Sequence, residues 1–109
     1  MEKWQELYLR EIQQGAAARA SGNEGRARVC ARRAASILIG EYFNRQRVPL
    51  PSSSAYNRLR LLASQPGLSP AAYELAAHLL ERVDTSFSLP AHIDLLADVQ
   101  QLARELFLL

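Results

Sequence analysis

The segment over residues 27–43 constrains the fold of this chain more than any other stretch. Its apolar residues recur so closely that a helix there is apolar around most of its circumference, because each residue advances by about 100° around the axis. Only a narrow strip through Arg26, Arg33 and Asn44 is left for water. The residues expected on the broad apolar face are Ala27, Cys30, Ala31, Ala34, Ile37, Leu38 and Tyr42. Such a helix must be covered by other helices on most sides.

The remaining segments carry the start and stop signals of helices that can provide this cover. Gly22 and Asn23 predict a tight turn between the first helix and the central one, since glycine accepts the left-handed conformation and asparagine caps a helix. Ser69 with Pro70, and later Pro90, predict two further helix starts. The expected helices cover residues 2–21, 24–46, 55–64, 70–83 and a last segment from residue 90.

Length and composition bound the architecture. Of the 109 residues, 17 are alanine, and hydrophobic residues make up 49%. Alanine and leucine dominate this set while valine and isoleucine are scarce, which favours helix over sheet. A chain of this length forms one core. The sequence therefore predicts an all-α, single-domain, up-and-down bundle of about five helices over residues 1–109, with the second helix central.

Two short stretches make finer predictions. Gly15 is followed by three alanines, so another backbone is expected to approach closely there. The linker over residues 48–54 contains two prolines and three serines. Prolines prevent helix continuation, and the linker is the best candidate for a disordered or partner-contacting loop.

The net charge of +2 hides an asymmetry between the two parts of the chain. Residues 19–60 hold nine arginines against two glutamates, a net of +7, whereas residues 61–109 have a net charge of −4. Such a split can indicate a polyanion site. It can equally indicate two oppositely charged parts that face each other within the fold or across a dimer, and this structural interpretation is the preferred one.

Arginines are the most informative polar residues. A phosphate-binding surface is the functional interpretation, because arginine forks suit phosphate oxygens. Its candidate residues are Arg26, Arg33, Arg58 and Arg60, of which the last two are expected to point mostly outward from the third helix. Exposed aromatic residues for base stacking are not expected, since Tyr42, Phe43 and Tyr56 are assigned to inward positions, and single-strand recognition therefore gains little support.

Two other arginines, Arg28 and Arg32, are expected at the edge of the apolar face of the central helix. A partly buried arginine needs an acceptor. Their side chains are predicted to reach carboxylates on neighbouring helices, such as those of Glu11 or Asp98.

No catalytic, cofactor or metal constellation is recognisable. Glu74, His78 and Arg82 are interpreted as a solvated row, and Asp94 and Asp98 as partners of arginines rather than an acid/base pair. No serine stands in a nucleophile turn, and no glycine-rich phosphate loop occurs. The sequence thus predicts a protein that is not an enzyme and that holds no metal or cofactor.

The hydrophobic C-terminal segment suggests self-association. It is costly to leave apolar side chains in water, at about 25 cal/mol per Å². Folding back over the bundle is one solution, but a symmetric homodimer is preferred. The expected interface residues are Leu106, Phe107, Leu108 and Leu109. No apolar run is long enough to span a bilayer, and a single cysteine without a signal peptide predicts a cytoplasmic protein.

The helix order, the turn through Gly22 and Asn23 and the second helix over residues 27–43 resemble HEPN-type helical domains. That resemblance implies a small, often dimeric bundle of the kind found in toxin-antitoxin and nucleotidyltransferase partner systems. Active RNase members carry an arginine separated from a histidine by four to six residues. The corresponding positions before the two histidines are Ala71, Ala72 and Tyr73, and Thr85, Ser86 and Phe87. The motif is absent, so no catalytic residue is carried over.

The combined prediction is a non-catalytic interaction or regulatory module that forms a homodimer, with an unknown protein as a further possible partner. The alternative is a module that binds RNA or another polyanion through the arginines of the second and third helices.

Overall fold

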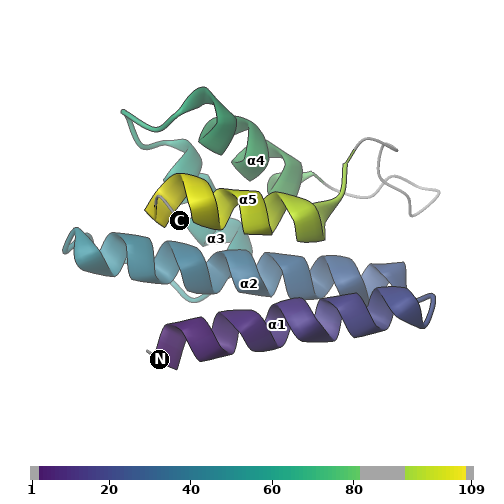
Figure 1. Cartoon of the computed structure of the whole chain (residues 1–109). Helices are drawn as coiled ribbons and strands as arrows, with labels where there is room; N and C mark the ends of the chain where they lie inside the picture. The colour runs from purple at the N-terminus through teal and green to yellow at the C-terminus, as the bar shows by residue number, and fades with distance from the viewer. Residues whose placement is uncertain (1–2, 82–92, 108–109) are drawn as a thin grey trace.

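The computed structural model describes residues 3–81 and 93–107, and within these ranges it contains five helices and no strand. The helices are α1 (Lys3–Ala20), α2 (Glu24–Arg45), α3 (Ala55–Ala63), α4 (Pro70–Leu80) and α5 (Leu95–Phe107). Figure 1 shows α2 in the middle, with α1 along one side and α3, α4 and α5 on the other. This confirms the prediction of an all-α bundle around the second helix. None of the described helices combines the length and apolarity needed to cross a membrane.

The α1–α2 hairpin forms as the turn residues predict. Gly22 adopts a φ of +85°, which an L side chain rarely accepts. The Asn23 side chain accepts a hydrogen bond of 3.0 Å from the backbone N–H of Arg26 and caps α2. The two helices therefore lie side by side in antiparallel directions (Figure 1).

Close packing of α1 on α2 depends on Gly15. A Cβ added there would lie 2.7 Å from Cδ2 of Leu96 and 3.2 Å from Cβ of Cys30. The backbone of α2 also comes close, since the carbonyl oxygen of Ala27 would lie 3.5 Å from that Cβ, and the expected close approach is confirmed. α5 also reaches this point, so Gly15 is where α1, α2 and α5 meet.

The core combines small and large residues of α2 with large side chains from its neighbours. Five small residues of α2 are fully buried, namely Ala27, Cys30, Ala31, Ala34 and Ala35, and the larger α2 residues Leu38, Ile39 and Phe43 are buried with them. The largest residues packed around α2 are Leu59 and Leu62 of α3, Leu79 of α4, and Leu95, Val99 and Leu102 of α5. Cys30 is thus a core residue, and α2 is covered on most sides as its composition requires.

Two helix boundaries differ from the prediction by more than one residue. The fourth helix ends at Leu80 instead of residue 83, and the fifth begins at Leu95. Asp94 determines the second boundary, because its carboxylate accepts a hydrogen bond of 3.2 Å from the N–H of Ala97. Pro90, the predicted start, lies outside the described residues.

The linker over residues 48–54 is tied to α2. Ser36 of α2 donates a hydrogen bond of 3.1 Å to the carbonyl of Ser53, and Ser54 caps α3 by accepting from the N–H of Asn57 at 3.3 Å. The prediction that this linker is disordered is therefore wrong, and the alternative that it contacts a partner stays a prediction.

Candidate polyanion-binding surface

The exposed strip of α2 carries two arginines and one glycine at intervals of seven residues. Arg26 and Arg33 are exposed, and Gly40 follows after the same interval. Seven residues correspond to almost two turns, with a drift of about 20°. The three positions therefore lie on one face, separated by about 10 Å along the axis.

Arg58 of α3 places its guanidinium group on α2 at Gly40. Its Nε donates to the carbonyl of Ser52 at 2.8 Å, and its Nη1 donates to the carbonyl of Ser36 at 2.8 Å. A Cβ at Gly40 would overlap with Nη1 of Arg58. The expectation that Arg58 points mostly outward from α3 is thus wrong. We call Arg26, Arg33 and Arg58 the arginine row.

No carboxylate neutralises the arginine row within the described part of the chain. None of its three guanidinium groups has a carboxylate oxygen within the 4.0 Å that defines an ion pair. Each carries a full positive charge, and so the row is an uncompensated basic surface.

The interpretation that the two oppositely charged parts of the chain face each other receives limited support within the fold. One described ion pair joins the basic and acidic parts of the chain, from Arg19 Nη2 to Asp94 Oδ1 at 3.0 Å. Arg19 also pairs with Glu24 at 2.7 Å. These carboxylates raise the pKa of Arg19 above its usual value. The candidate residues Arg26, Arg33, Arg58 and Arg60 make no ion pair with the described acidic residues.

Arg32 finds a different acceptor from the one predicted. Its Nε donates to the carbonyl of Leu79 at 3.0 Å and its Nη2 to the carbonyl of Glu81 at 2.6 Å. Both carbonyls lie at the C-terminal end of α4, where a positive charge is favoured. Burial and the neighbouring charge of Arg28 lower the pKa of Arg32. Arg32 therefore fixes α4 to α2.

His78 makes the predicted contact with Glu74, from Nε2 to Oε1 at 3.8 Å, but it also joins two helices. Its Nδ1 lies 3.0 Å from Oδ2 of Asp98 on α5, and its side chain is 21% exposed. Burial raises the pKa of Asp98, although the bond to His78 acts in the opposite direction. The predicted partner of Asp98, an arginine, is thus replaced by a histidine. Arg82 lies outside the described residues.

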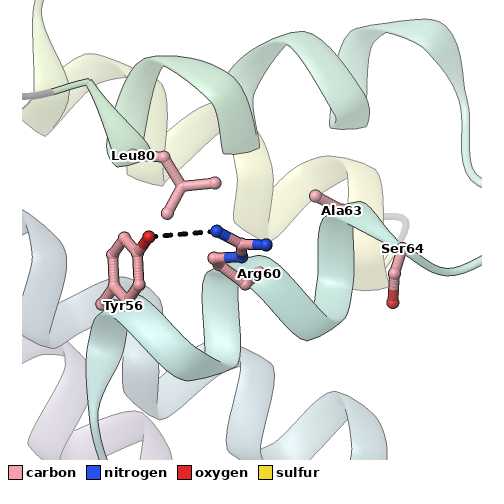
Figure 2. Close-up of a pocket in the computed structure, with 5 residues that line it drawn as sticks. All are labelled: Tyr56, Arg60, Ala63, Ser64 and Leu80. Carbon is pink, nitrogen blue, oxygen red and sulfur yellow. Dashed lines mark hydrogen bonds between the residues drawn. The ribbon is translucent and has the colours of Figure 1, made fainter.

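Arg60 lies apart from the arginine row, in a groove between α3 and α4 (Figure 2). The groove has a volume of about 450 Å³ and is lined by Tyr56, Arg60, Ala63, Ser64 and Leu80. Arg60 Nη1 donates to the Tyr56 hydroxyl at 3.1 Å. Tyr56 is 44% exposed, so its assignment to an inward position is wrong. The structure thus separates Arg58 and Arg60 onto opposite flanks of α3.

The C-terminal segment packs on its own chain as far as it is described. Phe107 stacks on Trp4 with a centroid distance of 5.1 Å, and the guanidinium carbon of Arg45 lies 4.9 Å from the Phe107 ring. Leu106 and Phe107 are half-buried. Leu108 and Leu109 lie outside the described residues.

The surface offers binding chemistry. Guanidinium groups attract phosphate, sulfate or carboxylate oxygens and donate paired hydrogen bonds to them. No group of three His, Cys, Asp or Glu side chains able to hold a metal ion occurs in the two described ranges.

The sequence did not lead us to predict that the Arg58 guanidinium group packs against Gly40. The available signal was an isolated glycine within a helix, which indicates a close approach.

Comparisons with protein-family models, with curated proteins and with solved structures give no match.

Proposed function

We propose that this protein is a non-catalytic module that binds a polyanionic partner through the arginine row. The observation that carries this proposal is the presence of three guanidinium groups on one face of α2 without a carboxylate partner in the described structure. Self-repulsion within such a row is relieved by an external anion.

The arrangement of the row favours an extended ligand over a single small anion. Arg26 and Gly40, against which the Arg58 guanidinium group packs, are fourteen residues apart on α2. This separation is about 21 Å along a straight helix. One phosphate or carboxylate group cannot contact sites so far apart. A chain of anionic groups can, and contacts at several points add up in affinity.

Binding is tested with a fluorescently labelled polyanion, heparin, by anisotropy at low and near-physiological salt. The Arg26→Ala/Arg33→Ala double variant is expected to bind more weakly by at least tenfold at low salt, because two of three charge contacts are lost. Arg60→Ala/Arg104→Ala is the matched control, since it removes the same charge away from the row. Equal weakening by both pairs would contradict a defined site, and no binding by the unchanged protein would refute the proposal.

Self-association remains a second proposal. A depression of about 220 Å³ at the end of α2 and α5, lined by Tyr42, Arg45, Gln46, Leu106 and Phe107, leaves part of the Phe107 region open. A second copy would cover this apolar surface. Light scattering tests it, with 12.2 kDa expected for a monomer and twice that mass for a dimer. The HEPN resemblance and the cytoplasmic location stay predictions.

A further inference from the structure

We infer that the polyanion is duplex nucleic acid, bound through its phosphate groups without base readout. This inference rests on the proposed function and deepens it. The residues beside the row, the fixed position of Arg58 and the rigidity of a duplex support it.

The exposed face of α2 has no aromatic side chain on which a base could stack. The exposed residues along this face are Arg26, Val29, Arg33 and Asn44, and the half-buried residues are Ile37, which was predicted on the buried face, and Gly40. Recognition of single strands relies on aromatic side chains between the basic contacts. Tyr56, the exposed aromatic residue of α3, lines the groove toward α4 (Figure 2), whereas Arg58 contacts the Ser36 carbonyl of α2. The row therefore provides charge without aromatic stacking.

Arg58 is positioned before any ligand arrives. Two backbone carbonyls, those of Ser36 and Ser52, hold its guanidinium group against Gly40. A side chain that is already fixed loses little conformational freedom on binding. This arrangement suits a ligand whose charges are also fixed in space, as the phosphates of a duplex are.

Rigidity separates a duplex from an acidic peptide. Each strand of a duplex carries one phosphate for each ~3.4 Å of its axis, so that about six phosphates of one strand lie along a row of ~21 Å. An extended peptide advances about 3.3 Å per residue and offers at most about six carboxylates over that length, on a flexible chain. The numbers of anions are similar, but the phosphates of the duplex hold their positions before binding, as the Arg58 guanidinium group does.

The test is a salt titration of binding by anisotropy. The probes are a short DNA duplex, an RNA duplex of the same sequence, the corresponding single strands and polyglutamate. Three phosphate contacts predict a slope of log K against log salt of about −2.7 on duplex DNA, since each contact contributes about −0.9. Tighter binding to duplex than to single strands or polyglutamate is expected, and the two duplexes distinguish DNA from RNA as the source of the phosphates.

The variants address the fixed guanidinium group. Arg58→Ala is expected to reduce the slope by about 0.9. Gly40→Ala retains every charge but displaces the Arg58 guanidinium group, so the same reduction is expected, with helix content by circular dichroism unchanged. Arg60→Ala is the matched control and should leave the slope as it is.

The outcomes test the duplex inference separately from the proposed binding of polyanions. Equal or tighter binding of single strands or of polyglutamate would overturn the duplex inference and leave the polyanion function standing. Binding by the Gly40→Ala variant with the full slope would overturn the role of Arg58 as a fixed contact. The absence of binding to every probe and to heparin would refute both.

Discussion

Two glycines within helices, Gly15 and Gly40, are each in contact with a side chain from another helix, Leu96 at the first and Arg58 at the second. Glycine inside a helix costs about 1 kcal/mol relative to alanine. At Gly15 the absence of a side chain permits close packing of three helices, and at Gly40 it permits the Arg58 guanidinium group to pack on the backbone of α2. The same feature thus serves stability at one site and positioning at the other.

Gly15→Ala should destabilise the protein relative to Gly25→Ala. Both changes gain helix propensity, but only the Cβ at position 15 would lie within 3.0 Å of another side chain, whereas at position 25 the nearest atom is 3.8 Å away. Overpacking costs about 1–3 kcal/mol, so the free energies of unfolding of the two variants should differ by about that amount. Urea denaturation measures it. Equal stabilities would show that Leu96 moves aside without cost.

Single residues also show where sequence reasoning ends. Burial of the small α2 residues follows from periodicity, because α2 is long and its apolar face is broad. Arg58 and Tyr56 were misplaced, since α3 has nine residues and both lie on its flanks. There, the orientation of a side chain depends on which element is adjacent, and that information is not local in sequence.

Among the elements, α5 depends on a residue just before its first turn. Asp94 accepts from the N–H of Ala97 and from Nη1 of Arg19 at 3.2 Å, and so both caps α5 and joins it to α1. The sequence indicated a start at Pro90, because proline is a strong local signal. A carboxylate whose partner is 75 residues away gives no such signal. In contrast, Gly22 and Asn23 placed the α1–α2 turn to within one residue.

Asp94 should make stability depend on acid pH. Burial pushes the pKa of Asp94 upward, but its bonds to Arg19 and to the N–H of Ala97 outweigh burial and hold the pKa below its usual value of 3.8. Asp94 therefore contributes stability above that value, and the contribution is lost as pH falls through the lowered native pKa.

The matching measurement is urea denaturation of the protein and of Asp94→Asn between about pH 6 and pH 2. Asparagine retains a capping oxygen but not the charge. The stability difference between the two proteins should shrink toward low pH. A difference that stays constant with pH would mean that the Asp94 charge contributes nothing.

At the scale of the whole molecule, the two ends of the chain meet beside the end of α2. Trp4 of α1 stacks on Phe107 of α5, Tyr42 of α2 meets Phe107 edge-on at 6.5 Å, and Arg45 covers both stacked rings. The apolar C-terminal segment indicated that its side chains are buried against other residues. Sequence alone did not distinguish cover by the same chain from cover by a second copy, since both remove the same area from water.

Phe107→Ala discriminates between these two kinds of cover. Loss of a fully buried phenylalanine costs about 3–5 kcal/mol, so the half-buried Phe107 should contribute about 2 kcal/mol. If the contact is within one chain, stability falls by this amount at every protein concentration while the mass in solution is unchanged. A fall in mass from dimer to monomer would instead support the interface proposed for Leu106–Leu109.

The distribution of charge is likewise a property of the whole molecule. Composition showed that arginines collect in the first part of the chain and acids in the second. Which charges meet was settled by the packing of α1 against α5 and of α3 against α2, and the arginine row was left without carboxylates in the described ranges. This is the basis of the polyanion proposal.

The most direct test of that proposal is a two-dimensional NMR titration of the protein with a polyanion, heparin or a DNA duplex, at low salt. The account predicts the largest shifts at the amides of Arg26, Val29, Arg33 and Gly40 and at the Nε–H of Arg58, all reversed by added salt. Shifts centred on the Tyr56 and Arg60 groove, or spread evenly over every exposed arginine, would contradict it.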